Sequence, residues 1–190
     1  MLVGWHTEIA KLWTARENPC PAPECPSLVV RDHQPREVPS RIVKADPGRT
    51  PSLLQAFDGS KPKPFAGTGS QQVPTCQLSG SDVVATIPAG YSTFAGCFVE
   101  TTTPMDLSAF QNGVVYVKLA HPAKQLEIKL EAGSDGDERL ETYLQQAQAA
   151  AGEHTFQVKD VPSEILKHAR RLTFAVNSDT GESNTITLRR

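Results

Sequence analysis

From residue 76 onward, the sequence is a series of short segments rich in β-branched and aromatic residues, each bounded by Gly, Pro, Asp or Asn. This pattern is typical of β-strands. In residues 125–131, Leu126, Ile128 and Leu130 alternate with charged or amide side chains, so one face is buried and the other is wet. Seven such segments predict an all-β fold, an antiparallel β-sandwich. The expected strands are residues 82–87, 93–100, 114–119, 125–131, 154–159, 171–176 and 185–189.

Two segments of this region have a helical pattern instead. Residues 138–151 contain a Gln/Ala run, which favours a helix. Residues 163–168 follow Pro162, and Ser163 is a suitable cap for a short helical turn. Neither segment is long enough to change the predicted fold class.

Proline divides the chain into two parts, because eleven of its fifteen prolines precede Cys76. Proline lacks an amide donor and has a fixed φ, so long helices and central strands are disfavoured where it is frequent. We therefore expect a Pro-rich linker or arm over residues 19–75 and the sandwich domain over residues 76–190.

A short amphipathic helix is expected over residues 1–18, ahead of the arm. Leu2, Trp5, Ile9, Leu12 and Trp13 recur at spacings of three and four, which places them on one helical face. Such a face can dock on a partner or a neighbouring domain. It can equally pack on its own domain or be the remnant of an upstream domain.

Composition excludes two classes of partner. No apolar run approaches the roughly 18 residues of a membrane-spanning helix. The net charge of -2 provides no basic field for nucleic acid. The first eight residues lack the basic start and unbroken apolar stretch of a secretory signal, which predicts a cytoplasmic chain as given. If the sequence is a fragment or a mature form, we expect an extracellular or periplasmic location.

The four cysteines, Cys20, Cys25, Cys76 and Cys97, allow two disulfides, but their number leaves the redox state open. Cys20 and Cys25 have a spacing that zinc sites use, and His33 follows closely. No second close pair completes a tetrahedral set of ligands. A proline-stiffened loop with free or bridged thiols is the simpler interpretation.

Asp106-Leu107-Ser108 with Phe110 is followed by the apolar segment 113–119. Segments 152–158 and 172–176 come later, with a turn at Pro162 between them. On these motifs, residues 78–190 resemble the galactose-binding-like β-sandwich superfamily, which implies a jelly-roll sandwich and includes many carbohydrate-binding modules and the complex I intermediate-associated protein family. Locally, an Asp106 or Ser108 side chain can cap the turn while Leu107 and Phe110 enter the core.

The resemblance implies a glycan or polysaccharide ligand, which usually stacks on an aromatic face while polar groups bind its hydroxyls. The chain departs from the usual pattern: His154 and Phe156 stand where such modules commonly carry Trp, and no Trp follows residue 13. The stacking platform is then expected among the tyrosines. The predicted ligand-binding residues are Tyr91, Tyr116 and Tyr143 for stacking, and Glu100, Lys118 and Gln125 for hydroxyl contacts.

The resemblance also implies a structural calcium ion as the one expected cofactor. The acids Asp135, Asp137 and Glu138 lack the EF-hand spacing, and a solvated loop explains them. Asp58 and Glu182 are the alternative metal ligands, at the edge of the sandwich. The resemblance implies ligands from early and late strands, and these two residues are chosen by their position alone.

No catalytic group can be assembled from the sequence. Gly90 and Ser92 form only half of a nucleophile elbow, and the five histidines are scattered singly. We therefore predict a non-catalytic carbohydrate-binding module-like domain, with the accessory domain of a polysaccharide-acting enzyme as one setting. The alternative is a protein-interaction or assembly module on the same fold, using Trp5, Trp13 and the Pro-rich arm.

Overall fold

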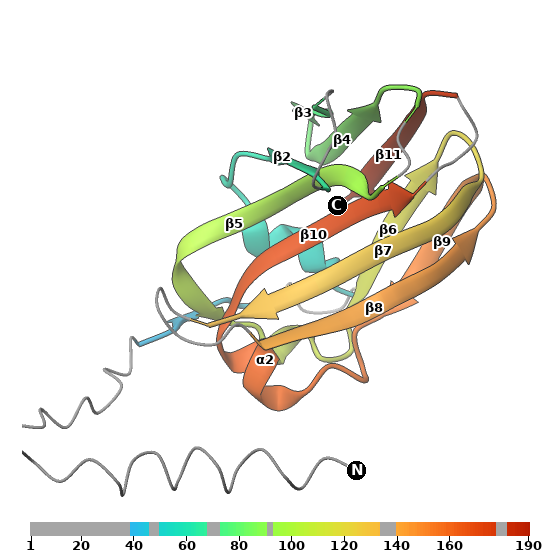
Figure 1. The fold of residues 1–190 in the computed structure, drawn as a ribbon. Coiled ribbons are helices and arrows are strands. Elements are labelled where there is room, and N and C mark those ends of the chain that lie inside the picture. The colour runs from blue at the N-terminus through green and yellow to red at the C-terminus, as the bar shows by residue number, and fades with distance from the viewer. Residues whose placement is uncertain (1–38, 46–49, 68–72, 91–92, 134–139, 178–181) are drawn as a thin grey trace, which may run out of the picture. The chain divides into compact units, whose positions relative to one another are not determined.

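The computed structural model describes residues 39–45, 50–67, 73–90, 93–133, 140–177 and 182–190. Most of these residues are in strands, which form two sheets that pack face to face (Figure 1). In this part of the chain no helix is long and apolar enough to cross a membrane. The fold is therefore an all-β sandwich, as the strand pattern predicts.

Sheet A has six strands in the order β1-β5-β10-β7-β8, with β2 also paired to β5. Only the contact of β1 with β5 is parallel. The central strand, β10, has β5 on one side and β7 on the other. The bounds are β1 (Arg41–Ile42), β2 (Lys63–Ala66), β5 (Ala95–Asp106), β7 (Ala123–Ala132), β8 (Leu140–Ala149) and β10 (Ala169–Asn177).

Sheet B has five strands in the order β3-β4-β11-β6-β9, all antiparallel. Within the described residues, three short helical segments connect successive strands along the chain. The strands are β3 (Thr75–Ser79), β4 (Asp82–Ile87), β6 (Val114–Leu119), β9 (Gly152–Gln157) and β11 (Asn184–Arg189). The helical segments are η1 (Leu53–Phe57), η2 (Ser108–Phe110) and α2 (Ser163–Lys167).

The core lies between the sheets and is formed mainly by the inward-facing residues of β4, β5, β6, β7, β10 and β11. In β7, Leu126, Ile128 and Leu130 are fully buried, as their alternation predicts. Leu172 and Phe174 of β10 are buried beside them. Each such side chain contributes roughly 1.5–3 kcal/mol through removal from water, so the pattern of period two fixes which face of each strand points outward.

All seven expected strands are present. β4 and β6 have the predicted bounds, four others differ by one or two residues at their ends, and β5 extends six residues beyond the predicted end at residue 100. The helical turn expected over residues 163–168 is α2, although its N-cap is Pro162 rather than the predicted Ser163 and no side chain caps it. The turn after β5 also forms as expected: the Asp106 carboxylate accepts hydrogen bonds from the amide and the hydroxyl of Ser108, while Leu107 and Phe110 are buried. The jelly-roll connectivity stays a prediction.

The helix expected over residues 138–151 is wrong, because residues 140–149 form strand β8 at the edge of sheet A. The Gln/Ala run has a high helix propensity. Pairing with β7 overrides it, since Ala147 lies opposite Leu126 and Tyr143 lies opposite Lys129. A helix here would leave that edge of β7 without hydrogen-bond partners.

The sandwich also begins before residue 76, inside the segment expected to be a linker. Leu53 and Phe57 of η1 are buried in the core, and β2 pairs with β5. Pro64 is compatible with β2 because this strand pairs on one side only, so its missing donor breaks no ladder. The predicted helix over residues 1–18 and the start of the expected arm, residues 19–38, lie outside the described residues.

A disulfide joins Cys76 of β3 to Cys97 of β5 and so links sheet B to sheet A. The sequence leaves the pairing open, because it gives no indication that these two strands face each other. Cys97 is fully buried, so the bridge is part of the core. Cys20 and Cys25 lie outside the described residues.

We predict that loss of this disulfide lowers the free energy of unfolding by about 3 kcal/mol, because the bridge closes a loop of intermediate length. The two cysteines are 21 residues apart in sequence. Urea denaturation of the wild type with and without dithiothreitol, and of a Cys76→Ala/Cys97→Ala double variant, measures the loss. The reductant should leave the variant unchanged. An equal effect of the reductant on both proteins would assign the stabilisation to other cysteines.

Candidate functional site

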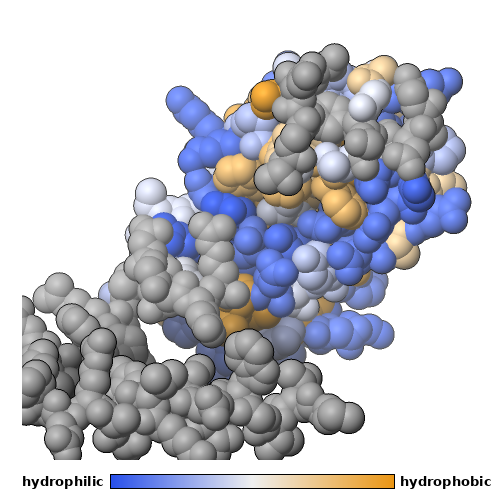
Figure 2. Space-filling view, in the orientation of Figure 1, coloured by the Kyte–Doolittle hydropathy of each residue, from blue (hydrophilic) through white to orange (hydrophobic). Residues whose placement is uncertain are grey.

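The outer face of sheet A is the most distinctive polar surface in the described part of the chain. It is formed by the residues that alternate with the core positions, and it faces the viewer in Figure 1. Figure 2 shows hydrophilic residues over most of this side, with apolar ones gathered toward one end. Cross-strand register places on this face Lys63, Phe65, Gly96, Phe98, Glu100, Gln125, Glu127, Lys129, Glu131, Glu141, Tyr143, Gln146, Arg171, Thr173, Ala175 and Asn177.

Ion pairs connect this face from β2 to the central strands. Lys63 of β2 donates a hydrogen bond to the Glu100 carboxylate of β5. Arg171 of β10 donates to Glu100 Oε2 through Nη2 at 2.7 Å and through Nε at 3.2 Å. On its other side, Arg171 Nη1 lies 3.6 Å from Glu131 Oε2 of β7. The guanidinium therefore bridges carboxylates on both neighbouring strands.

The chain of contacts continues from β7 to β8. Lys129 Nζ lies 3.7 Å from Glu131 Oε1 and 3.1 Å from Glu141 Oε2. The hydroxyl group of Tyr143 donates a hydrogen bond to Glu141 Oε1 at 3.0 Å. We call this set of seven residues, which crosses five strands, the charge ladder: Lys63, Glu100, Arg171, Glu131, Lys129, Glu141 and Tyr143.

The charge ladder is more buried at its centre than at its ends. The side chains of Lys63 and Glu141 are 56% and 42% exposed, whereas those of Lys129 and Glu131 are 15% and 8% exposed. Thr173 adds a hydrogen bond from its hydroxyl to Glu131 Oε2 at 3.2 Å. The central groups are therefore held in place by several partners each, which reduces their freedom before any ligand arrives.

Two aromatic rings lie under the cations of the ladder. The Arg171 guanidinium lies 4.4 Å from the ring centroid of Phe98, and Lys129 Nζ lies 5.8 Å from that of Tyr143. Both distances are within the range of cation–π contacts. Tyr143 remains 40% exposed on edge strand β8, so it offers ring surface to solvent.

The carboxyl groups of this face have different ionisation behaviour. The hydrogen bond from Lys63, with Arg171 adding to it, lowers the pKa of Glu100, and the hydrogen bond from Lys129 lowers that of Glu141. Glu127, which lies opposite Gln146, behaves in the opposite way because burial raises its pKa. Glu100 and Glu141 are therefore stable anionic acceptors at neutral pH.

The structure brings three of the predicted ligand-binding residues onto this face: Glu100, Gln125 and Tyr143. Gln125 lies opposite Asn177, whose side-chain oxygen is buried and has no hydrogen-bond partner among the described residues. Tyr116 and Lys118 belong to β6 and lie on the outer face of sheet B. Tyr91 lies outside the described residues.

The sequence reasoning missed the residues at the centre of the ladder, Arg171, Lys129 and Glu131. The available signal was their position, because Lys129 and Glu131 alternate with the apolar residues of β7. That alternation shows which face they occupy. It does not show that Arg171, from a segment about forty residues later, lies between two carboxylates.

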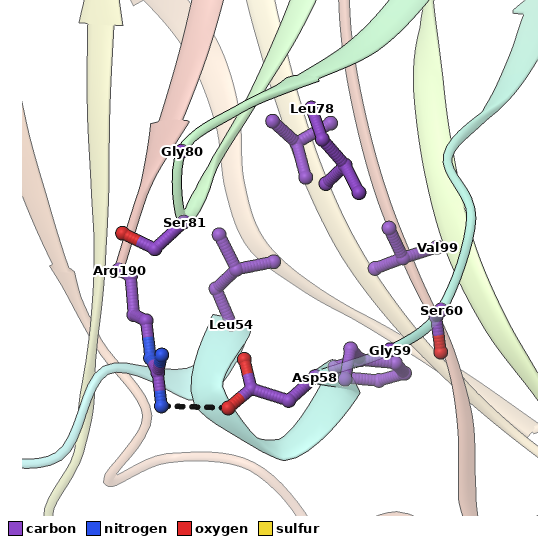
Figure 3. A pocket seen from close by; sticks show the side chains of 11 residues that line it. Leu54, Asp58, Gly59, Ser60, Leu78, Gly80, Ser81, Val99 and Arg190 are labelled. Carbon is purple, nitrogen blue, oxygen red and sulfur yellow. Dashed lines mark ion pairs between the residues drawn. The ribbon is translucent and has the colours of Figure 1, made fainter.

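A separate feature is a pocket of about 260 Å³ at the edge of the sandwich. Leu54, Leu78 and Val99 form much of its apolar wall, and Asp58 with Arg190 lies at one end (Figure 3). Arg190 Nη2 is 2.6 Å from Asp58 Oδ2, so the carboxylate already has a cationic partner.

The other predicted metal ligand is Glu182. Its Oε2 atom lies 3.7 Å from Nδ1 of His121. Within the described ranges no three His, Cys, Asp or Glu side chains are grouped as metal ligands would be. The acids at 135, 137 and 138 lie outside those ranges. The calcium site therefore stays a prediction.

Comparison with known proteins gives no family model and no curated protein that matches the chain. Among solved structures, two variants of a family 29 carbohydrate-binding module are similar, with TM-scores of 0.43 and 0.41 and identities of 11% and 12%. Each alignment covers 70% of this chain, and 79% and 74% of the modules. The iron(II) form of HppE aligns with a TM-score of 0.23 and 13% identity, over 77% of this chain and 63% of its own. Similarities this distant do not support an assignment by themselves. The fold class therefore rests on the two observed sheets.

We predict that Arg171→Met lowers the free energy of unfolding by about 2 kcal/mol, because it leaves Glu100 and Glu131 without their shared cation. The methionine stem retains the packing on Phe98. Lys63→Met is the matched control at the exposed end, where we expect a loss of less than about 1 kcal/mol. Urea denaturation measures both, and equal losses would contradict the central role of Arg171.

A second prediction concerns Glu127, whose folded-state pKa is raised above the ordinary value of 4.5. The unfolded chain then releases its proton first, so this group reduces stability as the pH rises above 4.5. Glu127→Gln should therefore stabilise the protein more at pH 7 than at pH 4, as measured by urea denaturation at both values. A gain that is independent of pH would contradict the assignment.

Proposed function

We propose that this protein is a non-catalytic carbohydrate-binding module that binds a glycan on the outer face of sheet A. The observation that carries this proposal is the charge ladder, a continuous row of hydrogen-bonding groups across five strands with an exposed tyrosine at one end. Sugar recognition combines an aromatic surface for the CH groups of the ring with fixed polar groups for the hydroxyls.

The residues of this face have suitable roles in such a site. Tyr143 is the stacking residue, because its ring is exposed and its hydroxyl is held by Glu141. Glu100 keeps further acceptor capacity for sugar hydroxyls after its contacts with Lys63 and Arg171. Gln125 lies on the same face opposite Asn177, and its side-chain amide can both donate to and accept from sugar hydroxyls.

Binding fits these carboxylates better than catalysis does. A glycosidase needs one carboxyl group that stays protonated at working pH and a second one placed across the scissile bond. Glu100 and Glu141 have lowered pKa values, and each is joined to a lysine. Glu127 is the described carboxyl group of this face whose pKa is raised, but it is only 6% exposed and so has little access to a substrate. The chemistry of Glu100 and Glu141 is that of fixed hydrogen-bond acceptors.

The disulfide supports an oxidising compartment for this module, either extracellular or periplasmic. An accessory role beside a polysaccharide-acting enzyme fits that setting, and a structural calcium ion at Asp58 or Glu182 remains part of the proposal. The alternative, an assembly module that uses Trp5, Trp13 and the Pro-rich arm, depends on residues mostly outside those that the structure describes.

The test is affinity gel electrophoresis of the full chain against soluble polysaccharides, with and without calcium. Two tyrosine variants locate the face, because Tyr143 is on sheet A and Tyr116 is on sheet B. We expect Tyr143→Ala to weaken binding about tenfold, the scale of one lost aromatic contact, and Tyr116→Ala to leave it unchanged.

The opposite result, loss of binding in Tyr116→Ala alone, would move the site to sheet B. Retardation by no polysaccharide would contradict the proposed function. Binding assays on a protein partner would then begin with the N-terminal segment.

A further inference from the structure

We infer that the ligand of the charge ladder is an internal stretch of an uncharged polysaccharide, which lies across the strands of sheet A along the ladder. This inference rests on the proposed function and names the class of glycan. Two independent features of the ladder support it, namely its charge pairing and its dimensions.

The charges of the ladder compensate one another within the face. It contains three cations and three carboxylates in alternating order, with successive contacts up to 3.7 Å. At the centre of the ladder, where the Lys129 and Arg171 side chains are only 15% and 23% exposed, a carboxylate or sulfate group of an anionic polysaccharide would have to displace one of these carboxylates to reach a cation. The displaced group would then be left partly buried without its partner, which is costly.

Glu127 makes the face still less suitable for an anionic polymer. It lies on β7 two residues before Lys129, on the same face, and is buried. When it is ionised, the face carries one more carboxylate than the ladder cations neutralise. Hydroxyl groups of an uncharged sugar, in contrast, can donate to carboxylates and accept from Lys or Arg without disturbing any ion pair.

The dimensions of the ladder indicate an extended ligand. It crosses five adjacent strands, which at about 4.8 Å per strand spacing corresponds to about 19 Å. Among the described residues nothing buries either end, since the Lys63 and Glu141 side chains are 56% and 42% exposed. A site that is open at both ends accommodates the interior of a polymer, whereas recognition of a chain end needs a closed pocket.

The experiment is isothermal titration calorimetry of the full chain at about 0.05 M and about 0.5 M NaCl, which changes the screening length severalfold. The uncharged probes are galactomannan, xyloglucan and mixed-linkage β-glucan, each also as oligosaccharides of increasing length. The charged probes are polygalacturonate, alginate and chitosan. We expect an uncharged polymer to bind with a Kd that changes less than about twofold with salt. Affinity should increase with oligosaccharide length until the ladder is filled.

A pair of variants tests the role of charge pairing. Glu100→Gln/Glu141→Gln removes two carboxylates from the ladder and leaves the face with excess positive charge. We expect this variant to gain salt-sensitive binding of polygalacturonate. The control is Glu153→Gln, which removes a carboxylate paired with Arg189 at 2.7 Å on sheet B and should change neither kind of binding.

The outcomes separate the two proposals. Salt-sensitive binding of an anionic polymer by the wild type would overturn the inference and leave the proposed function standing. A monosaccharide that binds as tightly as the polymer would overturn the extended ligand. Binding of no glycan would overturn the proposed function itself. If the double variant fails to fold, as judged by thermal unfolding, the wild-type salt and length series still decide the question.

Discussion

The ion pairs of Arg171 with Glu100 and Glu131 are the contacts on which the polar face of sheet A depends. They join β10 to both of its neighbours, and the lysines at positions 63 and 129 extend them to β2 and β8. These contacts exist only in one register, because Leu172 next to Arg171 is buried in the core. A slip of one residue would bury the guanidinium and expose the leucine. The apolar core and the charged face are therefore two consequences of one strand alignment.

The local pattern of the sequence was sufficient to predict the fold class. It was insufficient to predict which residues come together in the candidate site. Alternation in residues 125–131 showed which side chains of β7 face outward, and this is confirmed. The partners of these side chains come from segments tens of residues away, and no local pattern encodes that pairing. Tyr116 and Tyr143 were therefore grouped in one predicted site, although their strands belong to opposite sheets.

The errors in the sequence reasoning have a common physical cause, namely that tertiary pairing overrides local propensity. Residues 140–149 have the composition of a helix, but an edge of β7 was available and they form β8. The proline-rich segment contributes η1 to the core and β2 to the edge of β5, because a proline at an edge strand costs little. The bridge between Cys76 and Cys97 depends on β3, which forms by pairing with β4 in sheet B and so carries Cys76 opposite sheet A.

A face built from compensated charges has a different use from a face with excess charge. An excess of one sign attracts polyions from a distance and binds them in a salt-dependent way. Compensated charges create no such long-range field, yet each group retains strong local donors or acceptors. The desolvation cost of these ions is met within the folded protein by their mutual contacts, so a neutral ligand encounters polar groups that are already oriented. For this reason the pairing of Arg171 and Lys129 with carboxylates favours recognition of hydroxyl groups over recognition of anions.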